Sequence, residues 1–94
     1  MFFIETSHRF QPGRLVATQG VLEAVPLEEL LTAYSRHLCQ DWGLVCEEDW
    51  RSNDRAVKYG ARIISAYRSS TDVRFWIITE ADRSCTTLLL PSEY

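Results

Sequence analysis

The sequence predicts an α+β fold, in which N-terminal helices pack on one face of an antiparallel β-meander of three to four strands. Three observations lead to this class. An amphipathic helical pattern follows Pro26, a second helical pattern ends at Gly60, and the last third of the chain contains short apolar runs separated by turn residues. A length of 94 residues suits one domain, so residues 1–94 are expected to form a single α+β unit. Residues 1–11 are expected to be an irregular N-terminal extension.

A short strand and a short helix are expected before the first long helix. Pro12-Gly13 indicates a break in regular structure, and residues 14–18 are then predicted to form a short buried strand. This strand is expected to join an edge of the sheet or to pair with the C-terminal strand. Thr18 is a suitable cap for a helical turn over residues 19–24, which Gly20 keeps short.

The two longer helices are predicted from periodicity and from their end signals. Pro26 suits the first position of a helix that runs to about Gln40, and apolar residues recur along it at helical spacing: Leu27, Leu30, Leu31, Tyr34 and Leu38. A second helix is predicted from about Glu47 to Tyr59 and ends at Gly60. Since the second helix has fewer apolar residues, it is expected to pack along one edge.

Three strands are predicted in the C-terminal third, over residues 61–67, 73–81 and 85–90. The middle strand alternates clearly, so one face would carry Val73, Phe75, Ile77 and Thr79 and the other Arg74, Trp76, Ile78 and Glu80. Short turns between successive strands favour an antiparallel meander.

Composition excludes several classes of protein. The formal net charge is −3, whereas a protein that binds by neutralising many phosphates would be basic. No apolar run approaches the ~20 residues of a membrane span, and the first residues do not resemble a signal peptide. Three cysteines at irregular spacing do not predict a disulfide framework, so a cytoplasmic location is expected.

No residue pattern predicts a metal, a cofactor or a catalytic centre. His37, Cys39 and Cys46 lack the paired spacing of zinc ligands, and the glycines are isolated rather than grouped in a phosphate-binding loop. Cys85 has no local nucleophile signature around it. Glu80 and Asp82 flank a predicted hairpin and could form an acid–base pair, but turn carboxylates more often bond the backbone of their own turn. The chain is therefore expected not to be an enzyme.

Two surfaces are candidates for binding a partner. The first is an acidic segment flanked by two indoles, because aromatic anchors with a charged rim are typical of interface hot spots: Asp41, Trp42, Glu47, Glu48, Asp49 and Trp50. The alternative is the exposed face of the sheet around Arg74, Trp76 and Arg83. For the first surface the simpler interpretation is that either tryptophan belongs to the core and the acids only solvate and cap the helix. For the second it is a mixed, solvated surface.

Several segments resemble one family of small proteins. They are Gly13–Thr18, Asp41-Trp42-Gly43, Trp76–Ser84, Thr86-Thr87, and Leu90-Pro91 before Glu93-Tyr94. Together they resemble the "plasmid-related" proteins encoded on plasmids, integrative elements and prophages, over residues 12–94. The resemblance implies an accessory protein of bacterial mobile DNA, and it transfers no catalytic residues.

The resemblance leads to one main functional hypothesis. A small protein of this context is expected to act without catalysis, by binding a host or element protein complex, for example as an inhibitor of a CRISPR or restriction system. Nucleic acid is not expected as its main partner, and no membrane partner is expected. Two alternatives stay open: a nucleic-acid-associated regulator or plasmid-maintenance factor, and a small hydrolase that uses Glu80 and Asp82.

Overall fold

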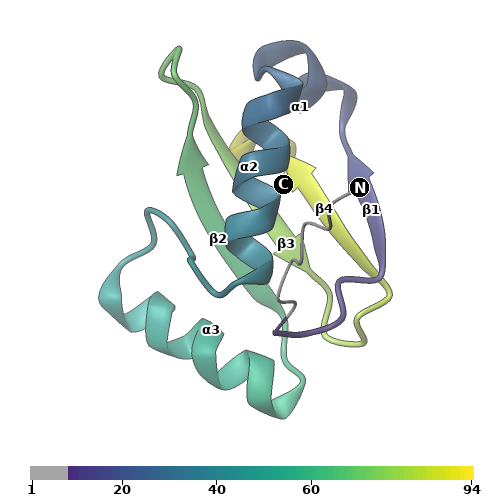
Figure 1. Cartoon of the computed structure of the whole chain (residues 1–94), viewed down its shortest axis with the longest axis vertical. Helices are drawn as coiled ribbons and strands as arrows, with labels where there is room; N and C mark the ends of the chain where they lie inside the picture. The colour runs from purple at the N-terminus through teal and green to yellow at the C-terminus, as the bar shows by residue number, and fades with distance from the viewer. Residues whose placement is uncertain (1–8) are drawn as a thin grey trace, which may run out of the picture.

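A computed structural model describes residues 9–94 of the chain (Figure 1). The elements follow in the order β1 (Arg14–Ala17), α1 (Gln19–Ala24), α2 (Leu27–Leu38), α3 (Glu47–Tyr59), β2 (Ile63–Arg68), β3 (Arg74–Thr79), β4 (Cys85–Leu89) and the short 3₁₀ helix η1 (Pro91–Glu93). The α+β class is confirmed. Most of the expected irregular extension, residues 1–8, lies outside the described residues. Within residues 9–94, no helix combines the length and the apolarity that a membrane crossing needs.

The four strands form one sheet in the order β1-β4-β3-β2. Strands β2, β3 and β4 make the predicted antiparallel meander, because short turns join them. Strand β1 lies at an edge of the sheet and pairs with β4, and both were expected. The pairing is parallel, however, with Arg14 opposite Cys85 and Ala17 opposite Leu88. The prediction of a wholly antiparallel sheet was therefore wrong at β1. Most of the chain separates β1 from β4, so no turn constrains their relative direction.

Helices α1 and α2 cover one face of this sheet (Figure 1). Alternation along β2 and β3 points Tyr67, Phe75 and Ile77 into that face, as the sequence predicts for β3. They pack there against the buried side of the helices, with Val21, Val25, Leu30, Ala33 and Leu88 completing the cluster. The opposite face of the sheet carries Ile64, Trp76 and Thr87.

Capping decides where the helices begin and end. The Oγ1 of Thr18 accepts a hydrogen bond from the backbone N–H of Val21 at 3.2 Å, which confirms the expected cap of α1. Gly60 ends α3 in the left-handed region, at φ 77°, also as expected. Helix α2 is shorter than predicted at both ends. Pro26 is its N-cap rather than its first helical residue, and the chain leaves the helix after Leu38.

Helix α3 lies beside β2 and closes that edge of the sheet. The amide of Asn53 pairs with the backbone of Ile64 like a neighbouring strand: Nδ2 donates to the carbonyl at 2.7 Å, and Oδ1 accepts from the N–H at 3.2 Å. The loop before α3 continues this cover, because Leu44 N–H donates to Ala66 O and Ala66 N–H donates to Trp42 O. The β2 edge is thereby protected against pairing with another strand.

Removing the Asn53 amide is expected to destabilise the fold. Asn53 is 6% exposed, so water replaces its two hydrogen bonds poorly in Asn53→Ala, and we expect a loss of about 1–3 kcal/mol in the free energy of unfolding. Urea denaturation followed by circular dichroism measures it. Ser52→Ala, at the exposed neighbouring position of α3, is the control and should stay within about 0.5 kcal/mol of the native chain. Equal stability of the two variants would contradict this role of Asn53.

Candidate functional site

A hollow lies on the sheet face opposite α1 and α2. It has a volume of about 520 Å³ and is bounded by the loop before α3, the start of α3, strands β2 and β3, and the C-terminal residue. Trp76 and Tyr94 supply aromatic walls, and Leu44 and Ile64 supply aliphatic ones. Such a volume lies in the range of sites that bind small molecules. We refer to it as the Trp76–Tyr94 hollow.

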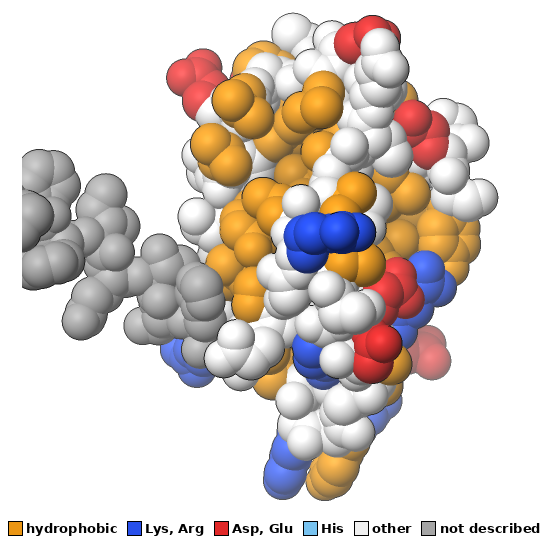
Figure 2. Space-filling view, turned by 90° about the vertical axis from the view of Figure 1, so that its right-hand side faces the viewer, with side chains coloured by type: hydrophobic (Ala, Val, Ile, Leu, Met, Phe, Trp, Pro, Cys, Tyr) orange, Lys and Arg blue, Asp and Glu red, His pale blue; other side chains and the backbone are white. Residues whose placement is uncertain are grey.

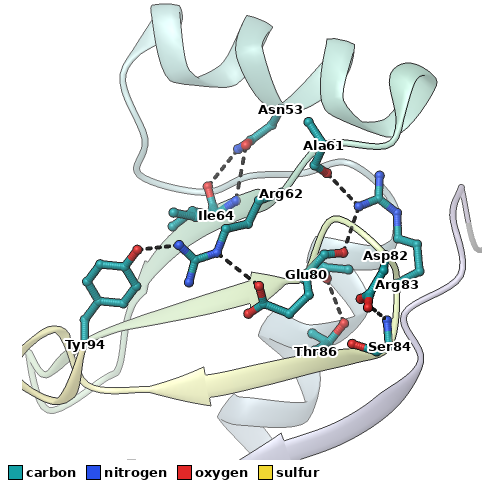
Figure 3. A network of polar contacts seen from close by, with 11 residues as sticks. Asn53, Ala61, Arg62, Ile64, Glu80, Asp82, Arg83, Ser84, Thr86 and Tyr94 are labelled. Atoms are coloured by element: carbon teal, nitrogen blue, oxygen red, sulfur yellow. Dashed lines mark hydrogen bonds and ion pairs between the residues drawn. The ribbon is translucent and has the colours of Figure 1, made fainter.

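A polar array holds Tyr94 in place as one wall of the hollow (Figure 3). The guanidinium of Arg62 lies over the Tyr94 ring, 5.1 Å from its centroid, and Nη1 donates a hydrogen bond to the phenol oxygen. The Nε of Arg62 also lies 3.4 Å from a carboxylate oxygen of Glu80. The indole of Trp76 meets the Tyr94 ring edge-on, with centroids 5.6 Å apart. Arg62 thus links the C-terminal residue to both β2 and β3.

The sheet-face candidates predicted from the sequence divide between two roles. Trp76 lines the hollow, and Arg74 is exposed two residues earlier on the same face of β3. Arg83 does not belong to this surface. Its guanidinium donates to the carbonyl oxygens of Ala61 and Glu80 (Figure 3). It also donates to the carbonyl oxygen of Ala56, and so ties the end of α3 to the β3–β4 turn. The structure therefore does not bring Arg83 together with Arg74 and Trp76.

The acidic segment is dispersed rather than gathered into one patch. Asp41 forms a two-point ion pair with Arg36, Nε to Oδ2 at 2.8 Å, and this hydrogen bond holds the pKa of the carboxyl below its usual range. Glu47 pairs with Arg51 one turn along α3 at 2.6 Å. Glu48 is exposed, and Asp49 lines the hollow. Of the acidic residues of this segment, the structure therefore brings only Asp49 to the Trp76–Tyr94 hollow.

The two tryptophans of that segment lie in the interior or against it. Trp42 is fully buried, and its Nε1–H donates to Asp54 at 2.9 Å. It packs with Ala56 and Ile63, and the half-buried Trp50 packs against the same cluster. The interpretation of Trp42 as a surface anchor is thus corrected, because burial leaves its indole no surface to offer.

A chain of hydroxyl groups surrounds His37 in the core. The imidazole nitrogens lie 2.6 Å from Ser65 Oγ and 2.8 Å from Thr79 Oγ1, and the Thr79 oxygen lies 2.7 Å from Thr86 Oγ1. Thr86 donates to the carbonyl of Pro12 at 2.7 Å. The rings of Phe10 and Trp42 pack edge-on against the imidazole, with centroids 5.5 and 5.4 Å from that of His37.

The direction of the hydrogen bonds along this chain assigns the tautomer of His37. Thr86 donates its one proton to Pro12, so Thr79 must supply the proton between the two threonine oxygens. Thr79 can then only accept from the ring, and Nε2 carries the ring proton. The Nδ1 nitrogen accepts from Ser65. Every proton of the neutral ring and its hydroxyl neighbours has an acceptor.

This environment keeps the ring uncharged and out of reach of ligands. Burial, with a smaller contribution from the charge of Arg83, lowers the pKa of His37 to about 3. Both ring nitrogens are occupied by hydroxyl groups, and the residue is fully buried. His37 is therefore a structural residue in this conformation. The signal for it was in the sequence: Ser65, Thr79 and Thr86 are polar residues at inward positions of strands.

The other chemically reactive side chains are apart from one another. Glu80 faces Arg62, and Asp82 accepts the backbone N–H of Ser84 at 2.9 Å. The Ser84 side chain, and after it this backbone bond, lowers the pKa of the Asp82 carboxyl. Neither carboxylate lines the hollow. Across residues 9–94, no three His, Cys, Asp or Glu side chains gather as metal ligands would.

The arrangement suits non-covalent binding. The hollow offers aromatic and aliphatic walls for an apolar group, with Arg62 and Asp49 as charged groups at its wall. Sequence reasoning identified Trp76 here but missed Tyr94, whose role depends on the return of the C-terminus to the sheet. Compared with models of protein families, with curated proteins and with solved structures, the chain has no match.

Proposed function

We propose that the chain is a non-enzymatic protein-binding module that takes up a side chain of its partner in the Trp76–Tyr94 hollow. The observation that carries this proposal is an aromatic-walled hollow on the sheet face that α1 and α2 leave uncovered. Aromatic residues in a pocket are the usual centre of binding energy in protein interfaces, and arginine is enriched around them.

The charges around the hollow indicate the kind of segment that fits. Arg62 lines the hollow, and Arg74 is exposed beside Trp76. Of the carboxylates on the first turns of α3, Glu47 pairs with Arg51 of the same helix, and Asp49 lines the hollow on the side of α3. A partner segment with an apolar side chain next to acidic residues would match both the walls and the rim.

The sequence resemblance favours a particular source for this partner. If the chain is an accessory protein of mobile DNA, its partner is a host protein complex that acts against such DNA. Cells that carry a CRISPR or restriction system should then accept a targeted plasmid more efficiently when they express the chain. Transformation efficiency that is the same with and without the chain would argue against this partner for the system tested.

Substitution in the hollow tests the binding mode without knowledge of the host. Peptides selected from a random display library on the immobilised chain should contain an apolar residue beside Asp or Glu. Trp76→Ala removes an aromatic wall of the hollow and Arg74→Glu reverses the charge beside it, so each is expected to weaken peptide binding about tenfold or more. Isothermal titration of a selected peptide measures the affinity.

Glu48→Lys is the control for Arg74→Glu, because it also reverses one charge but on a surface away from the hollow. Glu48 is exposed on α3 and does not line the hollow, so affinity should change by less than about threefold. Circular dichroism checks that each variant is folded. If Glu48→Lys weakens binding and Trp76→Ala does not, the partner binds the acidic side of α3, and the proposal for the hollow fails.

A further inference from the structure

The two edges of the sheet differ in how their backbone is covered. On β2, Asn53 and the loop residues 42–44 bond the outward groups of Ile64 and Ala66. On β1, Arg14 and Thr18 donate inward to β4, so the N–H and C=O groups of Leu15 and Ala17 point outward. Among residues 9–94, nothing hydrogen-bonds those four groups. Strand β1 is thus an open edge of the kind that pairs with another strand.

Exposed leucines lie beside this edge. Glu29 accepts hydrogen bonds from the turn between β2 and β3, and the guanidinium of Arg36 lies 5.0 Å from the ring centroid of Tyr67 on β2. That flank of α2 therefore faces β2, and the opposite flank, with Leu27 and Leu31, is directed towards β1. Figure 2 shows hydrophobic side chains gathered over this side of the molecule. The exposed leucines of β1, α1 and α2 are 42–62% exposed: Leu15, Leu22, Leu27 and Leu31.

The geometry of the edge selects one antiparallel register between two copies of β1. Gly13 has φ +67°, which is not extended, so the only outward-facing residues within the strand are Leu15 and Ala17. Both pair only if Leu15 lies opposite Ala17 of the partner subunit, which places Val16 opposite the partner's Val16. This register makes four hydrogen bonds and is two-fold symmetric, as isologous dimers require. It also places Arg14 opposite the partner's Thr18, so the Arg14 side chains of the two copies do not face each other.

We propose that two copies of this chain associate through their β1 edges in this register. The two sheets then continue into one sheet of eight strands. The exposed leucines of both copies meet on its helical side and add apolar area to a short strand pair. The dimer leaves the Trp76–Tyr94 hollow on the other face, so this inference stands independently of the proposed function.

A disulfide across the two-fold axis tests the register directly. In a variant whose three native cysteines are serine, Val16→Cys should form a covalent dimer under mild oxidation, because opposed residues of a pair that is not hydrogen-bonded have Cα atoms about 4.5 Å apart. The control is Arg14→Cys in the same background. Its two copies would stand about 13 Å apart along the strands and should not cross-link. Equal cross-linking of the two variants, or none in Val16→Cys, would overturn the proposed register.

Sedimentation of the unmodified chain tests association itself. We expect a mass twice the 10.9 kDa of one chain at a concentration of about 100 µM. A mass of one chain throughout, up to about 500 µM, would refute the dimer. Leu15→Lys should raise the dissociation constant about tenfold or more, since an edge lysine opposes strand pairing. Leu44→Lys, at an exposed leucine lining the hollow, should leave it unchanged and so separates this surface from the proposed partner site.

Discussion

Replacement of Trp42 by alanine is expected to lower the free energy of unfolding by about 3–5 kcal/mol, more than the loss expected for Asn53→Ala. The indole is fully buried and touches the rings of Phe10 and His37 as well as the cluster of Ala56 and Ile63. Its loss opens a cavity next to the hydroxyl chain around His37, and Asp54 loses the indole N–H donor. Urea denaturation of the native and substituted chains measures the difference.

Trp50→Ala is the matched control, since it removes the same side chain from a half-buried position on α3. It should cost clearly less, about 1–2 kcal/mol, because only part of the indole is withdrawn from water. The comparison also decides between a core residue and a surface anchor. If Trp42→Ala retained native stability and lost only partner binding, the assignment of Trp42 to the core would be wrong.

Acid is expected to destabilise the fold well before the carboxylates are protonated. His37 has a pKa of about 3 in the folded chain and an ordinary value of 6.5. The unfolded chain therefore binds one more proton than the folded chain between these values. The stability associated with the neutral ring is fully present above pH 6.5 and declines by about 1.4 kcal/mol per pH unit below it, or roughly 2–3 kcal/mol by pH 4.5. Denaturation midpoints between pH 7 and 4.5 measure the slope.

The pH window separates His37 from the acidic groups. Hydrogen bonds lower the pKa values of Glu29, Asp41, Asp82 and Glu93, so stability from these carboxylates is lost only as pH falls below their ordinary values of 3.8–4.5. A variant with His37→Leu, Ser65→Ala and Thr79→Val replaces the ring and both hydroxyls without leaving a donor unpaired. Its stability should lose this slope. An unchanged slope in the triple variant would show that another group takes up the proton.

The single substitution His37→Leu serves as the complement to this triple variant. It removes the acceptor of the Ser65 hydroxyl and the donor to Thr79, so we expect it to be about 1–3 kcal/mol less stable than the native chain. The triple variant should recover part of that loss at neutral pH, because apolar replacement of all partners removes the unmet polar groups. A triple variant that is less stable than the single one would contradict the hydrogen-bond pattern assigned to the ring.

Part of the candidate site could be predicted from sequence because it depends on strand alternation. The pattern of β3 places Arg74 and Trp76 on the face opposite Phe75 and Ile77, and the structure agrees. Tyr94 could not be placed in this way. It reaches Trp76 and Arg62 only because η1 returns the C-terminus to the sheet, and the bond to Arg62 joins residues 32 positions apart. The sequence likewise does not indicate that Arg83 bonds the end of α3, because its acceptor there, the Ala56 carbonyl, is 27 residues away in sequence.

Local signals in the chain were sufficient to predict the elements of this protein and their order. The stripe of apolar residues on α2, the glycine after α3 and the alternation of β3 each lie within a few turns of helix or a few strand residues. Folding of the whole chain was needed to set the parallel direction of β1 beside β4, the burial of Trp42, and the enclosure of His37 by hydroxyl groups. Each of these depends on contacts between residues distant in sequence, such as Arg14 with Cys85. Such a contact contributes free energy only once folding has brought its two partners together and removed them from water. A short stretch of sequence therefore cannot predict it.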